Sequence, residues 1–295
     1  GSYGTACLDT ATGKPLWKRD DMPCRHFRGP GSSPIVYRNL LILTFDGVDL
    51  QYLTALDTKI GETVWRTDRS TVWHDYDEQG KLIREGDFRK GYSTPIVIEA
   101  GGKAQLISPG STCAFAYDPL TGKELWSTRF DGFTPAACPV YGNGLAYIVS
   151  GRGKARLAAM RVDGHGDVTD SHTAWKFEGP ELPTEPSPIL VDGLLYLLSN
   201  NGTVTCLEAS NGAMVWSERI GGSFLASPIY ADGSLYFSST QGKTTVLKAG
   251  RAFENLAVNE LADGFMASPA VTGRALILRT KTHLYRIEDA AGKAK

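Results

Sequence analysis

The feature that most constrains the fold of this chain is a short motif that occurs four times. In each copy an acidic residue stands four positions before a glycine, and the glycine stands four positions before a tryptophan. The copy from Ala55 to Trp65 reads Ala-Leu-Asp-Thr-Lys-Ile-Gly-Glu-Thr-Val-Trp, and the others begin at Cys7, Ala116 and Cys206. A motif that recurs along a chain predicts a protein built from repeated structural units.

Each copy of the motif predicts a β-hairpin. Small, aliphatic or aromatic residues precede the acid and favour an extended strand. The acid and the glycine supply a side-chain acceptor and a permissive backbone for the turn, and the residues up to the tryptophan form the second strand. Because a single hairpin cannot bury its own faces, we expect the indoles to fill gaps between neighbouring units. The tryptophans assigned this structural role are Trp17, Trp65, Trp126, Trp175 and Trp216.

A second recurring feature, a small residue followed by proline, marks the start of each larger unit. Proline suits this position because it has no N–H group to give to the ladder of a sheet. The apolar runs and Asp-Gly turns that follow predict four short antiparallel strands in each unit, with a basic period of about 40 residues. The prolines are Pro34, Pro95, Pro139, Pro188, Pro228 and Pro269.

Four strands at this period predict a blade of a β-propeller, so we expect an all-β protein. Two units depart from the pattern: one has a long turn at residues 163–167, and one lacks the tryptophan, with Val258 near its place. We expect partial units at both ends of one propeller domain, residues 1–295, that lacks N-terminal strands. The complete units are predicted at residues 31–68, 91–130, 134–179, 185–220 and 224–262.

The composition argues against several other classes of protein. A formal net charge of −1 gives no basic excess for nucleic acid, and no apolar run is long enough to span a membrane. The five cysteines contain no C-x-x-C pair, so neither a zinc site nor a thioredoxin-type redox motif is indicated. The 33 glycines and evenly spaced strands favour one large all-β domain.

The repeats resemble the PQQ-like repeat, whose A-x-D-x-x-T-G-x-x-x-W signature is shared by quinoprotein dehydrogenases and by BamB-like proteins of outer-membrane assembly. The resemblance covers nearly the whole chain and implies a β-propeller, which in such families usually has eight blades. It also implies an exported protein, periplasmic or extracellular, whose full-length form begins well before Gly1. The signature is specific for the fold and not for the function.

The resemblance also bears on cofactors. Quinoprotein enzymes typically hold PQQ over a tryptophan and under a disulfide between adjacent cysteines, with calcium bound by Glu, Asn and Asp. No two cysteines of this chain are adjacent, and no motif matches the calcium set. We therefore expect a non-catalytic binding or scaffold module without a cofactor. The alternative is a PQQ-dependent alcohol or sugar oxidoreductase, because sugar-oxidising quinoproteins use a different propeller without that disulfide.

Two long loops predict the binding surface, because long loops on a rigid scaffold commonly carry function. They span residues 20–31 and 69–91, and each follows the last strand of a unit. A shorter connection contributes two aspartates, and all three segments are expected to leave the blades at one end. The residues assigned to the ligand site are Arg25, His26, Arg28, Asp46, Asp49, His74, Arg89 and Lys90.

These residues suit a protein partner or a small polar or anionic ligand, because arginine binds carboxylate or phosphate and histidine exchanges protons. The alternative is that the charges pair with one another and pin the loops. A weaker pattern, Asp75-x-Asp77-x-x-Gly80, follows part of the spacing of a calcium loop. Gly86 stands where the bidentate glutamate is needed, so a solvated acidic loop is the alternative there.

Overall fold

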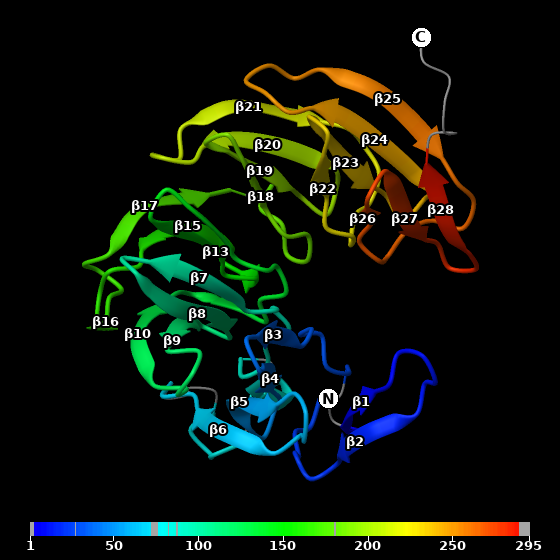
Figure 1. The fold of residues 1–295 in the computed structure, drawn as a ribbon. Helices are drawn as coiled ribbons and strands as arrows, with labels where there is room; N and C mark the ends of the chain where they lie inside the picture. The colour runs from blue at the N-terminus through cyan, green and yellow to red at the C-terminus, as the bar shows by residue number, and fades with distance from the viewer. Residues whose placement is uncertain are drawn as a thin grey trace. The chain divides into compact units, whose positions relative to one another are not determined.

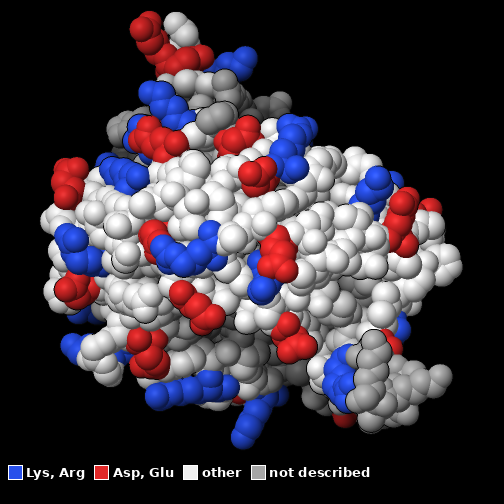
Figure 2. All heavy atoms as spheres, turned by 90° about the horizontal axis from the view of Figure 1, so that it is seen from above, with Lys and Arg blue, Asp and Glu red and all other residues white. Residues whose placement is uncertain are grey.

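The computed structural model describes residues 3–26, 28–71, 76–81, 83–86, 88–179 and 181–288. These residues are almost entirely β-structure, as expected, and their only helix is a short 3-10 helix, η1 (Ile83–Gly86). No helix in this part of the chain has the length and apolar character needed to cross a membrane. The chain forms two compact units, Gly1–Glu178 and Gly179–Lys295 (Figure 1). On the face shown in Figure 2, acidic and basic side chains are interspersed.

The first unit contains three complete meanders in which each strand is antiparallel to the next. The first sheet consists of β3 (Ile35–Tyr37), β4 (Leu40–Asp46), β5 (Gln51–Asp57) and β6 (Thr63–Asp68). The second consists of β7 (Ile96–Ala100), β8 (Lys103–Gly110), β9 (Cys113–Tyr117) and β10 (Glu124–Arg129), with β16 (Gly166–Asp167) added beside β10. The third consists of β12 (Val140–Gly142), β13 (Leu145–Val149), β15 (Arg156–Arg161) and β17 (Thr173–Glu178). Two smaller sheets are β1 (Thr5–Leu8) with β2 (Pro15–Arg19), and β11 (Gly132–Phe133) with β14 (Arg152–Gly153).

The second unit contains two further complete meanders and one sheet of three strands. The complete sheets are β18 (Ile189–Val191), β19 (Leu194–Leu198), β20 (Thr203–Glu208) and β21 (Met214–Arg219), then β22 (Ile229–Ala231), β23 (Ser234–Ser238), β24 (Lys243–Lys248) and β25 (Asn255–Glu260). The last sheet is β26 (Ala270–Thr272), β27 (Ala275–Arg279) and β28 (Leu284–Glu288). Each four-stranded sheet lies within one of the five predicted blade ranges.

The repeated segment from aspartate to glycine is a turn that the aspartate side chain closes. The Asp57 carboxylate accepts the N–H groups of the residues two and three positions on, and the Gly61 N–H donates to the Asp57 carbonyl. Asp9 and Asp118 close their turns with the same contacts. Gly61 has a φ of 74°, in the left-handed region that glycine adopts without strain. The local sequence therefore determines this turn.

The tryptophan of one sheet lies on the aspartate turn of the following sheet. Trp65 donates its Nε1–H to the Pro119 carbonyl at 3.2 Å, and a Cβ atom on Gly122 would meet the Trp65 ring at 2.5 Å. Trp17 likewise donates to the Thr58 carbonyl at 3.0 Å. The glycine of the motif thus leaves room for an indole from the neighbouring sheet, which explains the spacing of acid, glycine and tryptophan.

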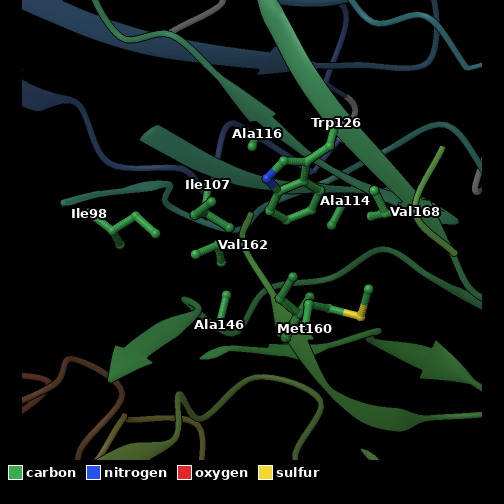
Figure 3. Packing of buried hydrophobic residues seen from close by; sticks show 10 residues of the cluster. Ile98, Ile107, Ala114, Ala116, Trp126, Ala146, Met160, Val162 and Val168 are labelled. Carbon is green, nitrogen blue, oxygen red and sulfur yellow. The ribbon is translucent and has the colours of Figure 1, made fainter. Parts of the chain in front are cut away.

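Trp126 is fully buried because a long turn covers it. Its Nε1–H donates to Gln105 Oε1 at 3.0 Å. Strand β16 pairs in parallel with β10, and the Val168 N–H donates to the Ser127 carbonyl at 2.8 Å, which places Val168 beside the indole (Figure 3). The long turn at residues 163–167 therefore closes the outer edge of the sheet β7–β10.

Trp175 and Trp216 are half-buried. Trp216 donates its Nε1–H to the Gly250 carbonyl at 3.1 Å, and its ring lies 5.5 Å from the Phe253 ring. The Trp175 ring centroid lies 5.8 Å from that of Tyr147. Trp216 thus repeats, within the second unit, the contact with a following turn that Trp65 makes in the first.

The strand register locates the position at which the sheet β22–β25 lacks its tryptophan. Ala257 pairs with Val246 just before a bulge, as Trp216 pairs with Cys206 just before the equivalent bulge. Ala257 therefore occupies the tryptophan position, one residue before Val258, which the sequence places near it. The sequence pattern does not give the exact residue, because the turn before β25 has a different length from its counterparts.

Hydroxyl groups before the prolines link neighbouring sheets. The Ser187 N–H donates to Ser227 Oγ at 3.0 Å, and the Ser227 N–H donates to Ser268 Oγ at 2.9 Å. In the first unit the Ser33 N–H donates to Thr94 Oγ1 at 2.8 Å. The small residue before each of these prolines therefore carries a hydrogen bond between sheets, in addition to starting a strand.

We expect Gly122→Ala to destabilise the protein more than Gly144→Ala. Both glycines have positive φ, 72° and 78°, so the backbone strain is similar, but nothing lies within 4 Å of a Cβ at Gly144. The clash with Trp65 should add about 1 to 3 kcal/mol to the loss of unfolding free energy. Chemical denaturation of both variants measures the difference. Equal losses would show that close approach of the indole does not require this glycine.

Candidate functional site

The two long loops of the first unit both contact the connection between β4 and β5. The Val48 N–H donates to the Arg25 carbonyl at 3.0 Å, and the Arg25 N–H donates to Asp49 Oδ1 at 2.8 Å. From the other loop, the Gly91 N–H donates to the Asp46 carbonyl at 3.3 Å. The structure therefore brings these segments together. We call this region the loop cluster, and it comprises the described residues of the segments 20–31, 46–50 and 69–91.

A buried ion pair lies beneath the loop cluster. Arg69 Nε and Nη2 donate to the two carboxylate oxygens of Asp46 at 2.6 and 2.7 Å, and neither side chain is exposed. Arg69 also donates to the carbonyl and hydroxyl of Ser108 at 3.3 and 3.0 Å, and its guanidinium lies 5.0 Å from the Phe115 ring centroid. Burial alone would lower the pKa of Arg69, but the Asp46 carboxylate outweighs burial and raises it. The guanidinium therefore stays charged, and the pair joins the loop at residues 69–91 to two sheets.

Arg69 was not among the site residues assigned from the sequence, although the repeats contain a signal for it. Its N–H donates to the Gln51 carbonyl at the start of β5, the third strand of the sheet. The N–H groups of Phe130, Ile220 and Leu261 make equivalent bonds in their sheets. The equivalent side chains are apolar, so an arginine at this position indicates a buried acidic partner. The sequence does not identify that partner as Asp46, which was assigned instead to the ligand.

His26 lies half-buried within the loop cluster. Its ring centroid is 6.3 Å from that of Tyr92, and its buried Nδ1 has no hydrogen-bond partner among the described residues. Burial lowers the pKa of His26 from its ordinary value, while the carboxylates of Asp46 and Asp49 act in the opposite direction. At neutral pH the cluster therefore presents a neutral imidazole ring.

The cations assigned to the site differ in their exposure. Arg25 and Arg28 are exposed, and Arg89 is half-buried with its guanidinium 4.9 Å from the Tyr76 ring centroid. Lys90 is only 1% exposed and lies inside the protein. The arginines are therefore accessible to a partner, whereas Lys90 and the Asp46 carboxylate lie beneath the surface.

The calcium pattern is only partly described by the structure. His74 and Asp75 lie outside the described residues. Asp77 Oδ1 accepts the N–H groups of Gln79 and Lys81 at 3.1 and 2.8 Å, so its carboxylate closes a local turn. Among the described residues, no group of three or more His, Cys, Asp or Glu side chains is arranged to hold a metal ion. Calcium binding here stays a prediction.

Comparison with known proteins identifies the family of the chain. The family described as outer membrane protein assembly factor BamB matches residues 51–295, so the chain belongs to this family of PQQ-like repeat proteins. The outer membrane protein assembly factor BamB of Yersinia pestis is 21% identical over 227 residues, which cover 72% of this chain and 51% of that protein. The chain thus spans about half the length of this curated relative.

Two solved structures show the same fold. BamB from Moraxella catarrhalis is 15% identical with a TM-score of 0.68, and the match covers 95% of this chain and 76% of that one. Quinohemoprotein alcohol dehydrogenase from Comamonas testosteroni is 15% identical with a TM-score of 0.66, over 94% of this chain and 60% of that one. At these identities the similarity shows the fold alone. The predicted all-β propeller fold, with four-stranded antiparallel blades, is confirmed.

The cysteines of this chain do not fit the PQQ site that the resemblance implies, because that site uses a disulfide between adjacent cysteines. The cysteines, all free thiols, are Cys7, Cys24, Cys113, Cys138 and Cys206. Burial raises the pKa of Cys24 to about 12, with further contributions from Asp49 and Asp46. Cys24 is therefore an unreactive thiol at the base of the loop cluster. The expected lack of a cofactor stays a prediction.

We expect Arg69→Met and Asp46→Asn each to lower the free energy of unfolding by about 3 to 5 kcal/mol, because each leaves a buried charge without its partner. The double variant should lose less unfolding free energy than the sum of the two single losses. Chemical denaturation of the unmodified protein, the two single variants and the double variant measures this coupling. Lys18→Met is the control, because Lys18 pairs with Asp20 on the surface, where such a pair contributes less than about 1 kcal/mol. Losses no larger than that of the control would show that the pair does not stabilise the loop cluster.

Proposed function

We propose that this chain is a non-catalytic, exported module, periplasmic or extracellular, that binds a polypeptide partner through the loop cluster. Membership of a family named for an outer membrane assembly factor supports a binding role. The observation that carries the proposal is the buried Asp46–Arg69 pair. The pair anchors the 69–91 loop to the sheets, and Asp49 and Val48 bond the 20–31 loop at Arg25, so the described charged groups of both loops are presented on a supported surface.

The chemistry of this surface suits an acidic polypeptide segment. Arg25 and Arg28 are exposed, and a guanidinium group can bind a carboxylate through two parallel hydrogen bonds. The neutral His26 ring adds a site for contact with less polar groups. A surface that is already ordered loses little conformational entropy on binding. A small anionic ligand would use the same arginines, and the experiment below distinguishes the two.

We also propose that residues 1–295 form one PQQ-like propeller domain. The same four-stranded meander occurs in both compact units. The contact of a tryptophan with the following turn occurs in each of them as well, at Trp65 and at Trp216. Both observations support a single type of repeat throughout the chain.

Site-specific photocrosslinking in the source bacterium tests the binding role. A photoreactive amino acid at Arg25 or Arg28 should give a discrete crosslink to one protein. The same group at Asn143, an exposed residue in the turn between β12 and β13, is the matched control and should give none. Arg25→Glu with Arg28→Glu should abolish the crosslink from a probe at Arg89, because reversed charges repel an acidic partner.

Three outcomes would contradict the proposal. Equal crosslinking from Asn143 would show non-specific capture. Binding of small carboxylates or phosphate that depends on the two arginines, without a protein crosslink, would favour the small ligand. A stoichiometric change in quinone absorbance during titration of the purified chain with PQQ and calcium would favour the oxidoreductase.

A further inference from the structure

The second unit has a hollow between the sheet β22–β25 and the sheet β26–β28. Its volume is about 370 Å³, and both sheets contribute apolar side chains to it. Such a volume lies within the range of ligand pockets in proteins. We call this hollow the inter-sheet groove. Its lining includes Ile229, Tyr236, Leu276, Leu278 and Ile287, with Asn259 and Glu260 also in the lining.

Comparison with the preceding pair of sheets, β18–β21 and β22–β25, shows part of the reason why the groove is open. There, Leu198 pairs with Val204, and both side chains are fully buried. At the equivalent positions beside the groove, Ser238 pairs with Thr244, and their hydroxyl groups form a 3.0 Å hydrogen bond. A leucine is thus replaced by a much smaller serine, and a valine by a polar threonine of similar size, which leaves volume unfilled between the sheets.

The missing indole is the second reason. Trp216 lies in the preceding pair of sheets with its ring centroid 6.0 Å from that of Tyr196. Ala257 stands at the equivalent position of β25 and offers only a methyl group. An aromatic side chain is therefore absent at the place where the repeat normally supplies one.

Strand β25 borders the groove and has an open backbone edge. All six of its residues are exposed, including Leu256 at 48% and Val258 at 56%. Among the described strands, only β24 pairs with it. An exposed edge strand with apolar side chains is a template on which another chain can add a strand.

The protein itself shows how an outer strand accepts such an addition. Strand β16 pairs with the outer edge of β10, and Val168 next to it packs beside Trp126 (Figure 3). A strand added to β25 in the same way would bring a side chain beside Ala257. Because Ala257 is much smaller than tryptophan, the described residues leave space at this position for a larger side chain than Val168.

The negative charge of Glu260 at the groove adds a requirement on the side chains of the bound segment. Glu260 is exposed, lines the groove and makes no ion pair with another described residue. A basic residue near the aromatic side chain of the added strand would complement this carboxylate. The open edge of β25, the unfilled position beside Ala257 and the Glu260 carboxylate thus specify one kind of occupant. It is an extended segment with an aromatic and a basic side chain.

We propose that the inter-sheet groove binds an extended segment of a partner protein. The segment adds to β25 as a fifth strand, places an aromatic side chain beside Ala257 and directs a basic residue toward Glu260. This interaction is separate from the one proposed for the loop cluster, because it uses none of the same residues.

Fluorescence anisotropy with a labelled peptide tests the proposal on the full chain. The probe is acetyl-Thr-Lys-Trp-Thr-Val-Thr-amide carrying a fluorescent label, and the matched probe has alanine in place of its tryptophan. The tryptophan peptide should bind and should slow hydrogen exchange of the amides in residues 255–260. The alanine peptide should bind about tenfold more weakly or worse, because a buried aromatic anchor dominates such interfaces.

Variants of the chain test the location. Ala257→Trp should weaken peptide binding about tenfold or more, because it fills the groove. Ser238→Leu with Thr244→Val restores the pattern of the preceding sheets and should have the same effect, so the test does not rest on one variant. Met214→Trp adds an indole to the equivalent outer strand β21, beside a position that Trp216 already fills, and should leave binding unchanged.

Several results would overturn the proposal. One is that the tryptophan peptide does not bind. Another is that it binds both groove-filling variants as tightly as the unmodified chain. Sedimentation of the unmodified chain as a dimer that Ala257→Trp dissociates would identify a second copy as the occupant. Peptide binding that appears only after deletion of residues 289–295 would identify the chain's own last residues as the occupant.

Discussion

The contact on which this structure depends is that of a tryptophan from one sheet with the aspartate turn of the next. The aspartate closes the turn, the glycine removes the side chain that would block the indole, and the Nε1–H of the tryptophan bonds a carbonyl of the turn. One short motif therefore forms a hairpin and also connects that hairpin to its neighbour. Because each copy of the motif supplies both a turn and an indole, each further copy adds another contact of the same kind between neighbouring sheets.

Variations in this contact give different sheets different properties. Where the turn is longer, it adds β16 to the edge of β10 and buries Trp126 completely. Where the tryptophan is replaced by Ala257, the adjoining sheets leave a hollow and β25 keeps an open edge. The regular repeats thus provide the scaffold, and their exceptions give a closed edge at β10 and the groove that we propose as a binding surface.

The loop cluster follows the same rule. Arg69 occupies a position that is apolar in equivalent sheets, and it is compatible with burial only because Asp46 and Ser108 satisfy its guanidinium. The pair anchors the start of the 69–91 loop, while Val48 and Asp49 bond the 20–31 loop near its exposed Arg25. The family and the fold support a binding module. The proposed site consists of loop residues that lie outside the repeat motif.

The sequence by itself determined the blades and their turns, because strand patterns, Asp-Gly turns and the spacing of acid, glycine and tryptophan are local properties. It also identified the loops that meet in the first unit, because strand order determines the end at which each connection leaves a blade. Only the tertiary structure decided that Asp46 pairs with Arg69 and is not free for a ligand, and that Ala257 occupies the missing tryptophan position. Those facts depend on register and on contacts between residues distant in the chain, which no local pattern specifies.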